Sequence, residues 1–388
     1  MSEDHFSSTS STGWLGRIGD SIKGVLFGLV LIVVSVPVLF FNEGRAVKTR
    51  KTLDEGAKSV VTVPAEKTNP ANNGKLIHLT GKAQAEGVLE DADFGVSAQS
   101  LKLRREVEFY QWEETSQTDT KKKLGGGEET VTTYAYSKKW GDKPIDSSRF
   151  KHPQGHENPR PVLDDMTWTA EPVTVGGFTL SSGLVAQMGN YSAVSGDPAV
   201  ELPEEISGKK VQRENGGFYL GQKPDSPEVG DLRVSHEAVL PGDVSVIAAQ
   251  AGEGLEPYAA KAGGTIEILE VGKQGADSMF ATAQKNNNVL TWILRGVGAF
   301  LMFMGFAMLF RPLSVLADVL PIAGDIVGAG TGLIALLLTV AISFAVISVA
   351  WIFYRPLLGI PLALVAVAGF VFLVMKLMAQ RKRTRALA

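Results

Sequence analysis

The sequence predicts an α+β membrane protein with four transmembrane helices, arranged one plus three around a large β-rich extracytoplasmic domain. Two observations predict this class. One uncharged apolar run stands near the N-terminus and three more follow one another near the C-terminus, and a run of about 18 or more apolar residues can cross a bilayer as a helix. The segment between them, residues 42–288, is mostly polar and carries the short alternating patterns of strands.

The first span is predicted at residues 21–41, after a polar, Ser/Thr-rich tail at residues 1–20 that we expect to be disordered and cytosolic. Its apolar run is long for the hydrophobic part of a signal peptide, and no small-residue cleavage site follows it. We therefore expect this segment to be retained as a membrane anchor.

The C-terminal part predicts three more spans, at residues 289–310, 326–354 and 356–375. Residues 311–325 are apolar but interrupted by Asp, Pro and Gly, which predicts an interfacial or re-entrant segment. A basic tail at residues 376–388 favours a cytosolic C-terminus, because cytoplasmic flanks of spans are rich in Lys and Arg. Four spans then place both termini in the cytosol.

The composition excludes several kinds of site. The chain has no cysteine, so disulfides, thiolate nucleophiles and cysteine-ligated metals are excluded. A net charge of −3 gives no reason to expect a nucleic-acid partner. No P-loop, zinc-protease motif or nucleophile elbow occurs. We therefore predict no enzymatic reaction and no cofactor.

A weak candidate for a metal site lies in the polar segment. His152 and His156 have the spacing of two ligands on one helix face, and Glu157 follows them. Pro153 and Gly155 disfavour the helix that this spacing requires, and no third ligand is evident. We expect a loop here rather than a metal site.

The two long patterns of the polar segment suggest a β-hairpin. Residues 106–113 and 130–140 alternate apolar and polar side chains and are rich in aromatic and β-branched residues. The lysines, glycines and glutamates of residues 121–129 lie between them. We expect this tip to be long, flexible and solvated.

Gly324, Gly328 and Gly332 recur at four-residue spacing, which lets helix backbones approach closely. They predict a packing face, either within the chain or between two copies. Charged residues at membrane depth are functional candidates by default. Here they are also explained as bundle partners, helix caps or interface residues, and the alternative of ion or proton handling stays open; they are Arg295, Arg311, Asp318, Asp325 and Arg355.

An ordered set of segments resembles the LUMA family, also called transmembrane protein 43. The segments are residues 42–47 (NEGRAV), 106–113 (EVEFYQWE), 150–159 (FKHPQGHENP), 230–234 (GDLRV), 244–250 (VSVIAAQ), 288–295 (NVLTWILR), 311–328 (RPLSVLADVLPIAGDIVG) and 351–357 (WIFYRPL). The resemblance implies four spans with a luminal domain between the first two. It implies membrane organisers without established catalysis, whose animal members associate with themselves and with lamina and emerin-type partners in the endoplasmic reticulum and inner nuclear membrane.

The function expected from these features is that of a multi-pass membrane scaffold. Its extracytoplasmic domain is expected to bind proteins or envelope components, and its bundle to anchor the chain in the lipid bilayer and to support self-association. The alternatives are an ion or small-solute transporter built on helices two to four, and an extracytoplasmic membrane-associated enzyme. The lack of cysteine and the Ala/Gly-rich spans suggest a bacterial inner membrane, with residues 42–288 periplasmic.

Overall fold

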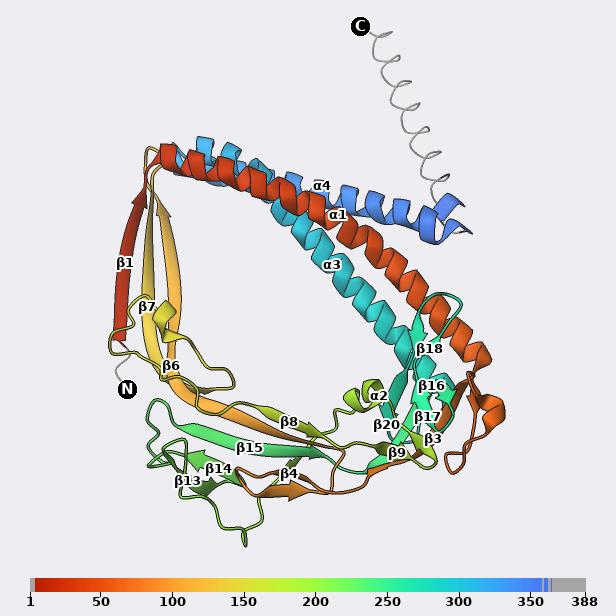
Figure 1. Cartoon of the computed structure of the whole chain (residues 1–388). Coiled ribbons are helices and arrows are strands. Elements are labelled where there is room, and N and C mark those ends of the chain that lie inside the picture. Colours follow the sequence, from red (N-terminus) through yellow and green to blue (C-terminus); the bar gives the residue numbers. More distant parts are fainter. Residues whose placement is uncertain (1–3, 358, 362–363, 365–388) are drawn as a thin grey trace. The chain divides into compact units, whose positions relative to one another are not determined.

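The computed structural model describes residues 4–357, 359–361 and 364, and its elements are labelled in Figure 1. The described chain divides into two compact units. The β-rich unit comprises residues 4–9, 52–119 and 131–281, and the helical unit comprises residues 10–51, 120–130 and those from 282 onwards. The α+β class with a large β-rich region is confirmed.

Three helices of the described chain are long and apolar enough to cross a membrane: α1 (Trp14–Ser59), α3 (Ala276–Ala317) and α4 (Pro321–Tyr354). They contain the spans predicted at residues 21–41, 289–310 and 326–354. With 46 residues at 1.5 Å each, α1 extends well beyond a ~30 Å hydrocarbon core. The fourth span and the basic tail, residues 356–375 and 376–388, lie largely outside the described residues.

Residues 311–325, predicted to be an interfacial or re-entrant segment, form the end of α3, a short turn and the start of α4. Helix α3 instead continues through Pro312 to Ala317, and α4 begins at Pro321 after a short turn. Pro312 is tolerated inside the helix because neighbouring helices and side chains can satisfy the freed carbonyl. Pro321 is well suited to open a helix, because its missing N–H is one of the unpaired groups of the first turn.

The N-terminal tail is ordered rather than disordered. Residues of strand β1 (Asp4–Thr12) pair with strand β7 (Glu128–Gly141), and the Ser7 hydroxyl lies 3.3 Å from that of Thr133. A run of Ser and Thr has enough β-propensity to add to an exposed sheet edge. Residues 4–9 of β1 therefore belong to the β-rich unit.

The larger sheet has nine strands, in the order β1-β7-β6-β15-β14-β13-β12, with β8 paired to β6 and β11 to β15. Its remaining strands are β6 (Lys102–Lys122), β8 (Met166–Thr169), β11 (Ser192–Val194), β12 (Glu205–Ile206), β13 (Lys209–Glu214), β14 (Gly217–Leu220) and β15 (Leu232–Val239). Its core contains Leu103, Val107, Phe218 and Val234.

The second sheet has seven strands, in the order β2-β3-β9-β10-β17-β16-β20, with a further β3–β16 pairing. They are β2 (Val61–Thr62), β3 (Leu76–Ala85), β9 (Val173–Val175), β10 (Phe178–Thr179), β16 (Gly242–Ala251), β17 (Gly254–Glu256) and β20 (Ile268–Val271). Two small pairs join β4 (Leu89–Asp91) to β5 (Val96–Ala98) and β18 (Tyr258–Ala259) to β19 (Thr265–Ile266). Helix α2 (Ser182–Ala186) is short.

The predicted hairpin is confirmed, but its tip differs from the prediction. Strands β6 and β7 are neighbours in the larger sheet, and the turn between them spans only residues 123–127. The Lys123 amide donates to the Gly127 carbonyl at 2.8 Å. Gly125 and Gly126 have φ of +87° and +80°, which glycine adopts without steric cost. The glycines thus close a tight turn instead of a long flexible loop.

Candidate functional site

A fully buried carboxylate joins the three long helices. Glu43 of α1 accepts hydrogen bonds from Arg295 Nε and Nη2 of α3 at 2.6 and 2.9 Å. It also accepts one from Trp351 Nε1 of α4 at 2.8 Å. A bidentate arginine–carboxylate pair with an added indole donor satisfies a charge that burial alone would make very costly. We call these three residues and their polar neighbours on α1 and α3 the Glu43 cluster.

The neighbours extend the Glu43 cluster along α1 and α3. Arg45 donates to Asn287 Oδ1 and Thr291 Oγ1, both at 3.0 Å. The Asn42 amide donates to the Thr291 carbonyl at 3.0 Å. Between them, a Cβ on Gly44 would lie 2.6 Å from the Tyr354 ring. The run at residues 42–45 therefore supplies polar side chains to α3 and a bare backbone surface to the end of α4.

The second group of charges, the Asp318 cluster, lies at the turn between α3 and α4. Asp318 accepts from Arg17 Nη2 at 2.5 Å and from Lys122 Nζ at 2.7 Å. Lys122 also contacts Asp325 at 2.7 Å, and Arg17 Nε contacts Glu128 at 2.9 Å. Since Lys122 and Glu128 flank the hairpin turn, this cluster fixes the tip of the hairpin to the helices.

Backbone and indole contacts add to this docking. The Gly125 amide donates to the Val319 carbonyl at 3.1 Å, and Trp14 Nε1 donates to the Val315 carbonyl at 2.9 Å. A Cβ on Gly126 would lie 2.3 Å from the Trp14 ring, so the turn packs directly against the start of α1. The tip is therefore held by backbone contacts as well as by charge.

In the Asp318 cluster, the pKa values of Asp318 and Lys122 are shifted from their ordinary values. Burial works against ionisation of Asp318, but the hydrogen bonds from Lys122 and Arg17 outweigh it and lower the pKa of Asp318. Burial likewise works against the charged form of Lys122, but its bonds to Asp318 and Asp325 raise its pKa. Both groups are thus charged when the tip is docked, and each stabilises the charge of the other.

The two clusters lie at opposite ends of an apolar stretch. Arg17 and Glu43 stand on the same helix, roughly 39 Å apart at 1.5 Å per residue. The uncharged run at residues 24–41 lies between them. Its length, about 27 Å, is close to the ~30 Å thickness of a bilayer hydrocarbon core.

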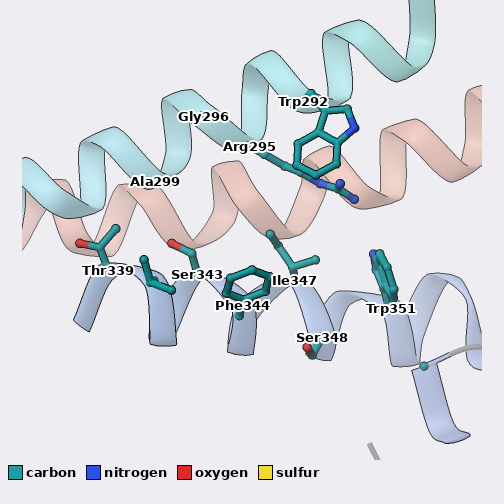
Figure 2. A pocket seen from close by; sticks show the side chains of 12 residues that line it. Trp292, Arg295, Gly296, Ala299, Thr339, Ser343, Phe344, Ile347, Ser348 and Trp351 are labelled. Atoms are coloured by element: carbon teal, nitrogen blue, oxygen red, sulfur yellow. The ribbon is translucent and has the colours of Figure 1, made fainter. Parts of the chain in front are cut away.

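A pocket of about 720 Å³ opens between α3 and α4, beginning beside the Glu43 cluster (Figure 2). Most of its wall is apolar, with hydroxyls on α4 and one arginine on α3. The Thr339 side chain is 4% exposed, and its hydroxyl has no hydrogen-bond partner among the described residues. The lining residues are Trp292, Arg295, Gly296, Ala299, Thr339, Val340, Ser343, Phe344, Ile347, Ser348, Trp351 and Gly359.

Comparison with known proteins identifies the family. A family model described as "Transmembrane protein 43" matches residues 109–356. The chain belongs to the transmembrane protein 43 family. It is 35% identical to transmembrane protein 43 of Mus musculus over 92% of this chain and 91% of the relative. It is 34% identical to the Homo sapiens protein over 92% and 90%, and 30% identical to the Drosophila melanogaster homolog over 89% and 93%. No solved structure matches.

This result confirms the resemblance inferred from the sequence segments. It also establishes the chain as a transmembrane protein 43 family membrane protein with candidate transmembrane helices. Several of the segments that carried the resemblance lie in the two clusters. Residues 42–47 supply Glu43 and Arg45, residues 311–328 supply Asp318 and Asp325, and Trp351 lies in the last segment.

The structure places the five charged candidates differently. Arg295 belongs to the Glu43 cluster, and Asp318 and Asp325 belong to the Asp318 cluster. Arg311 is exposed and lies inside α3. Arg355 caps the end of α4 and lies 5.7 Å from the centre of the Trp351 ring.

The three predicted packing glycines also differ in their surroundings. A Cβ on Gly324 would meet the Asp318 side chain at 1.6 Å, and one on Gly328 would meet Ser314 Oγ at 3.1 Å. These two positions therefore serve the close packing of α4 against α3 within the chain. A Cβ on Gly332 would have no atom of the described residues within 4 Å.

The candidate metal residues lie in a loop, as expected from the sequence. His156 stacks on Tyr136 with ring centres 4.0 Å apart, and its Nδ1 lies 3.1 Å from the His152 carbonyl. Burial and a hydrogen bond to Glu114 raise the pKa of Tyr136 to about 12. No group of three or more His, Asp or Glu side chains that could hold a metal, Glu157 included, occurs among the described residues.

Several residues of the clusters were missed by sequence reasoning. Glu43 and Arg17 stand at the two ends of the first apolar run and read as ordinary flanking charges. Lys122 and Glu128 read as part of a solvated tip. Sequence reasoning also missed a close approach between α1 and α3. A Cβ on Gly28 would lie 2.7 Å from the Gly305 carbonyl. Glycines inside predicted spans were the available signal for that contact.

Proposed function

We propose that this member of the transmembrane protein 43 family is a multi-pass membrane organiser. The helical unit anchors the chain in the bilayer, and the β-rich unit binds proteins or other envelope components. The observation that carries the proposal is the pairing of the buried charges: Glu43 with Arg295, and Asp318 with Arg17 and Lys122. Charges paired in this way fasten segments of the chain together, which is the task of an anchor.

A transporter built on the bundle is the alternative, and the same pairing makes it the weaker candidate. An ion or proton path requires polar groups that can exchange partners along a water-filled route. Glu43 is fully buried and already accepts three hydrogen bonds. An enzyme is the third candidate, and no group of three or more His, Asp or Glu side chains that could hold a metal supports it among the described residues.

The organiser is tested by photo-crosslinking of the full-length protein in its native membranes. A photoreactive residue replaces Val88 in the β-rich unit, and the matched control replaces Leu337 of α4; these side chains are 61% and 60% exposed. We expect a reproducible protein partner from position 88 and lipid adducts from position 337. Lipid or solvent adducts alone at position 88 would contradict the organiser.

Transport is tested by flux measurements on protein reconstituted in liposomes. The organiser predicts that the wild type gives no more ion or solute flux than empty liposomes. Flux that disappears in Glu43→Gln, while the variant still reconstitutes to the same density, would support the transporter and overturn the proposal.

The finer topology is part of the proposal. We place the chain in a bacterial cell membrane, with the basic C-terminal tail in the cytosol and the body of the β-rich unit outside it, because a compact Lys/Arg cluster favours the cytosolic side. Since the chain lacks cysteine, single cysteines at Val88 and Ala388 test this arrangement. An impermeant thiol reagent added to intact spheroplasts is expected to label position 88 and not position 388, and labelling of position 388 alone would contradict the arrangement.

Self-association is proposed through the open face at Gly332. A second helix can approach there without displacing any of the described residues. The mass of the particle in mild detergent tests this. We expect a multimer that Gly332→Leu weakens and that Thr331→Leu, one residue away on α4, does not. A strictly monomeric wild type would remove this part of the proposal.

A further inference from the structure

The pocket between α3 and α4 has the length of one lipid leaflet. Its lining on α4 extends from Thr339 to Trp351, about 18 Å at 1.5 Å per residue. Half of a ~30 Å hydrocarbon core is about 15 Å. Its volume of about 720 Å³ lies within the range of ligand pockets, roughly 300–1,000 Å³. A hydrocarbon chain that runs parallel to α4 therefore fits the pocket in length and in volume.

The two ends of the pocket differ in chemistry. Thr339 and Ser343 lie at the deep end, and Phe344 and Ile347 continue the wall along α4 (Figure 2). Trp292, Arg295 and Trp351 lie at the other end, where the Arg295 guanidinium is 4.6 Å from the centre of the Trp292 ring. Tryptophan and arginine together are typical of the level of lipid headgroups.

The charge at the headgroup end is positive. In and beside the Glu43 cluster, Arg45, Arg295 and Arg355 carry three positive charges against the single negative charge of Glu43, and Arg295 lines the pocket itself. Glu43 is fully buried and is occupied by Arg295 and Trp351. Within the described residues Arg355 makes no ion pair, and its guanidinium lies over the Trp351 ring that lines the pocket. A basic end between membrane helices is suited to a lipid phosphate.

We propose that this pocket is a specific site for one anionic glycerophospholipid. One acyl chain occupies the space between α3 and α4, and the phosphate lies against Arg355 and the exposed edge of Arg295. The lipid then links α3 and α4 at the level of the Glu43 cluster. This inference does not depend on the organiser function, because a transporter or an enzyme could hold the same lipid.

The site can be filled without disturbing the backbone. A Cβ on Gly296 meets nothing within 4 Å, so Gly296→Phe places its ring into the pocket from α3. Gly330 is the matched control, because it too is a helical glycine with no described atom within 4 Å of its Cβ position and it does not line the pocket. Both substitutions replace glycine with phenylalanine inside a membrane helix. Their effects on helix propensity therefore cancel in the comparison.

The test uses full-length protein in phosphatidylcholine vesicles that contain phosphatidylglycerol with a photoreactive group on its acyl chain. We expect adducts on peptides of residues 292–299 and 339–351, with about tenfold less labelling in Gly296→Phe and unchanged labelling in Gly330→Phe. Unlabelled phosphatidylglycerol is expected to compete, whereas the same concentration of phosphatidylcholine or inorganic phosphate is not. Thermal unfolding confirms that both variants are folded.

Several results would overturn the inference. Equal labelling of Gly296→Phe and wild type would show that the label does not report the pocket. Equal competition by phosphatidylcholine would show that the site does not select an anionic headgroup. Competition by inorganic phosphate alone would show that the acyl chain does not contribute to binding. A photoreactive residue at Ser348 that crosslinks to residues 365–388 of the same chain, rather than to lipid, would show that the protein occupies the pocket itself.

Discussion

The two charged clusters of the helical unit both pair buried carboxylates with basic side chains, but different elements of the chain supply the partners. The Glu43 cluster is built from the long helices alone, and its carboxylate is fully buried. The Asp318 cluster joins helices to a β-hairpin, and its partners Lys122 and Asp325 have side chains 28% and 69% exposed. The first joins α1, α3 and α4 to one another. The second is a contact between separate segments, so it should be weaker, more accessible and sensitive to pH.

The largest effect is expected at Glu43. Glu43→Gln keeps the acceptor for Trp351 but leaves the Arg295 guanidinium, 16% exposed, without an opposite charge. Loss of one partner from a buried ion pair costs about 3–5 kcal/mol. We expect this decrease in the free energy of unfolding, measured by reversible unfolding in detergent micelles.

The double variant Glu43→Gln with Arg295→Met sharpens that comparison. It removes the unpaired charge, and we expect it to recover most of the lost stability, since apolar replacement of both partners is often neutral. Arg311→Met is the control on the same helix, and its exposed side chain predicts a change within about 0.5 kcal/mol. A double variant as unstable as Glu43→Gln alone would show that the pair is not the cause.

A smaller and more local effect is expected at Asp318. Asp318→Asn keeps the size of the side chain but removes the charge that holds both Arg17 and Lys122. We expect faster amide hydrogen exchange at residues 120–130, by about tenfold or more, with little change in α1 and α3. Asp325→Asn is the control and should change exchange only slightly, because Asp325 is mostly exposed.

The docked tip is expected to respond to pH. The lowered pKa of Asp318 stabilises docking above the ordinary Asp value of about 3.9, and this contribution disappears as pH falls through the lowered value. The raised pKa of Lys122 stabilises docking below about 10.4, and that contribution disappears as pH rises through the raised value. Exchange at residues 120–130, corrected for intrinsic rates, should be slowest between these limits. A flat profile would contradict the ionic docking.

The smallest effect is expected at Thr339, between the two clusters. Its buried hydroxyl has no partner among the described residues, so Thr339→Val removes an unpaired polar group of nearly the same volume. We expect unchanged stability or a gain of up to about 1 kcal/mol. A loss above about 1 kcal/mol would mean that the hydroxyl has a partner in the membrane, such as a bound lipid or water.

The helices and the central strands could be predicted from the sequence because their signals are local. An apolar run of sufficient length identifies each described span, and alternation identifies β3, β15 and β16. The pairing of Glu43 with Arg295 could not be predicted. It joins residues 252 positions apart and depends on the register of α1 against α3. A flanking acid gives no local sign of such a partner.

The predictions for the hairpin tip and the N-terminal strand were wrong for a related reason. A run of lysines, glycines and glutamates looks solvated, yet here the glycines close the turn and Lys122 reaches Asp318, 196 positions away. The Ser/Thr-rich tail looks disordered, but the edge of β7 gives it backbone partners. In both cases long-range contacts override a compositional signal.

Zero-length crosslinking in intact membranes tests most directly whether the hairpin tip is fixed to the helical unit. A carbodiimide joins an amine to a carboxylate only when they are in contact, and Lys122 Nζ lies 2.7 Å from both Asp318 and Asp325. The pair of Lys139 and Glu113, 2.6 Å apart with side chains 49% and 29% exposed, provides the internal control. Mass spectrometry should find an amide between Lys122 and Asp318 or Asp325, absent in Lys122→Gln. A Lys139–Glu113 crosslink without any from Lys122 to these acids would contradict the docked tip.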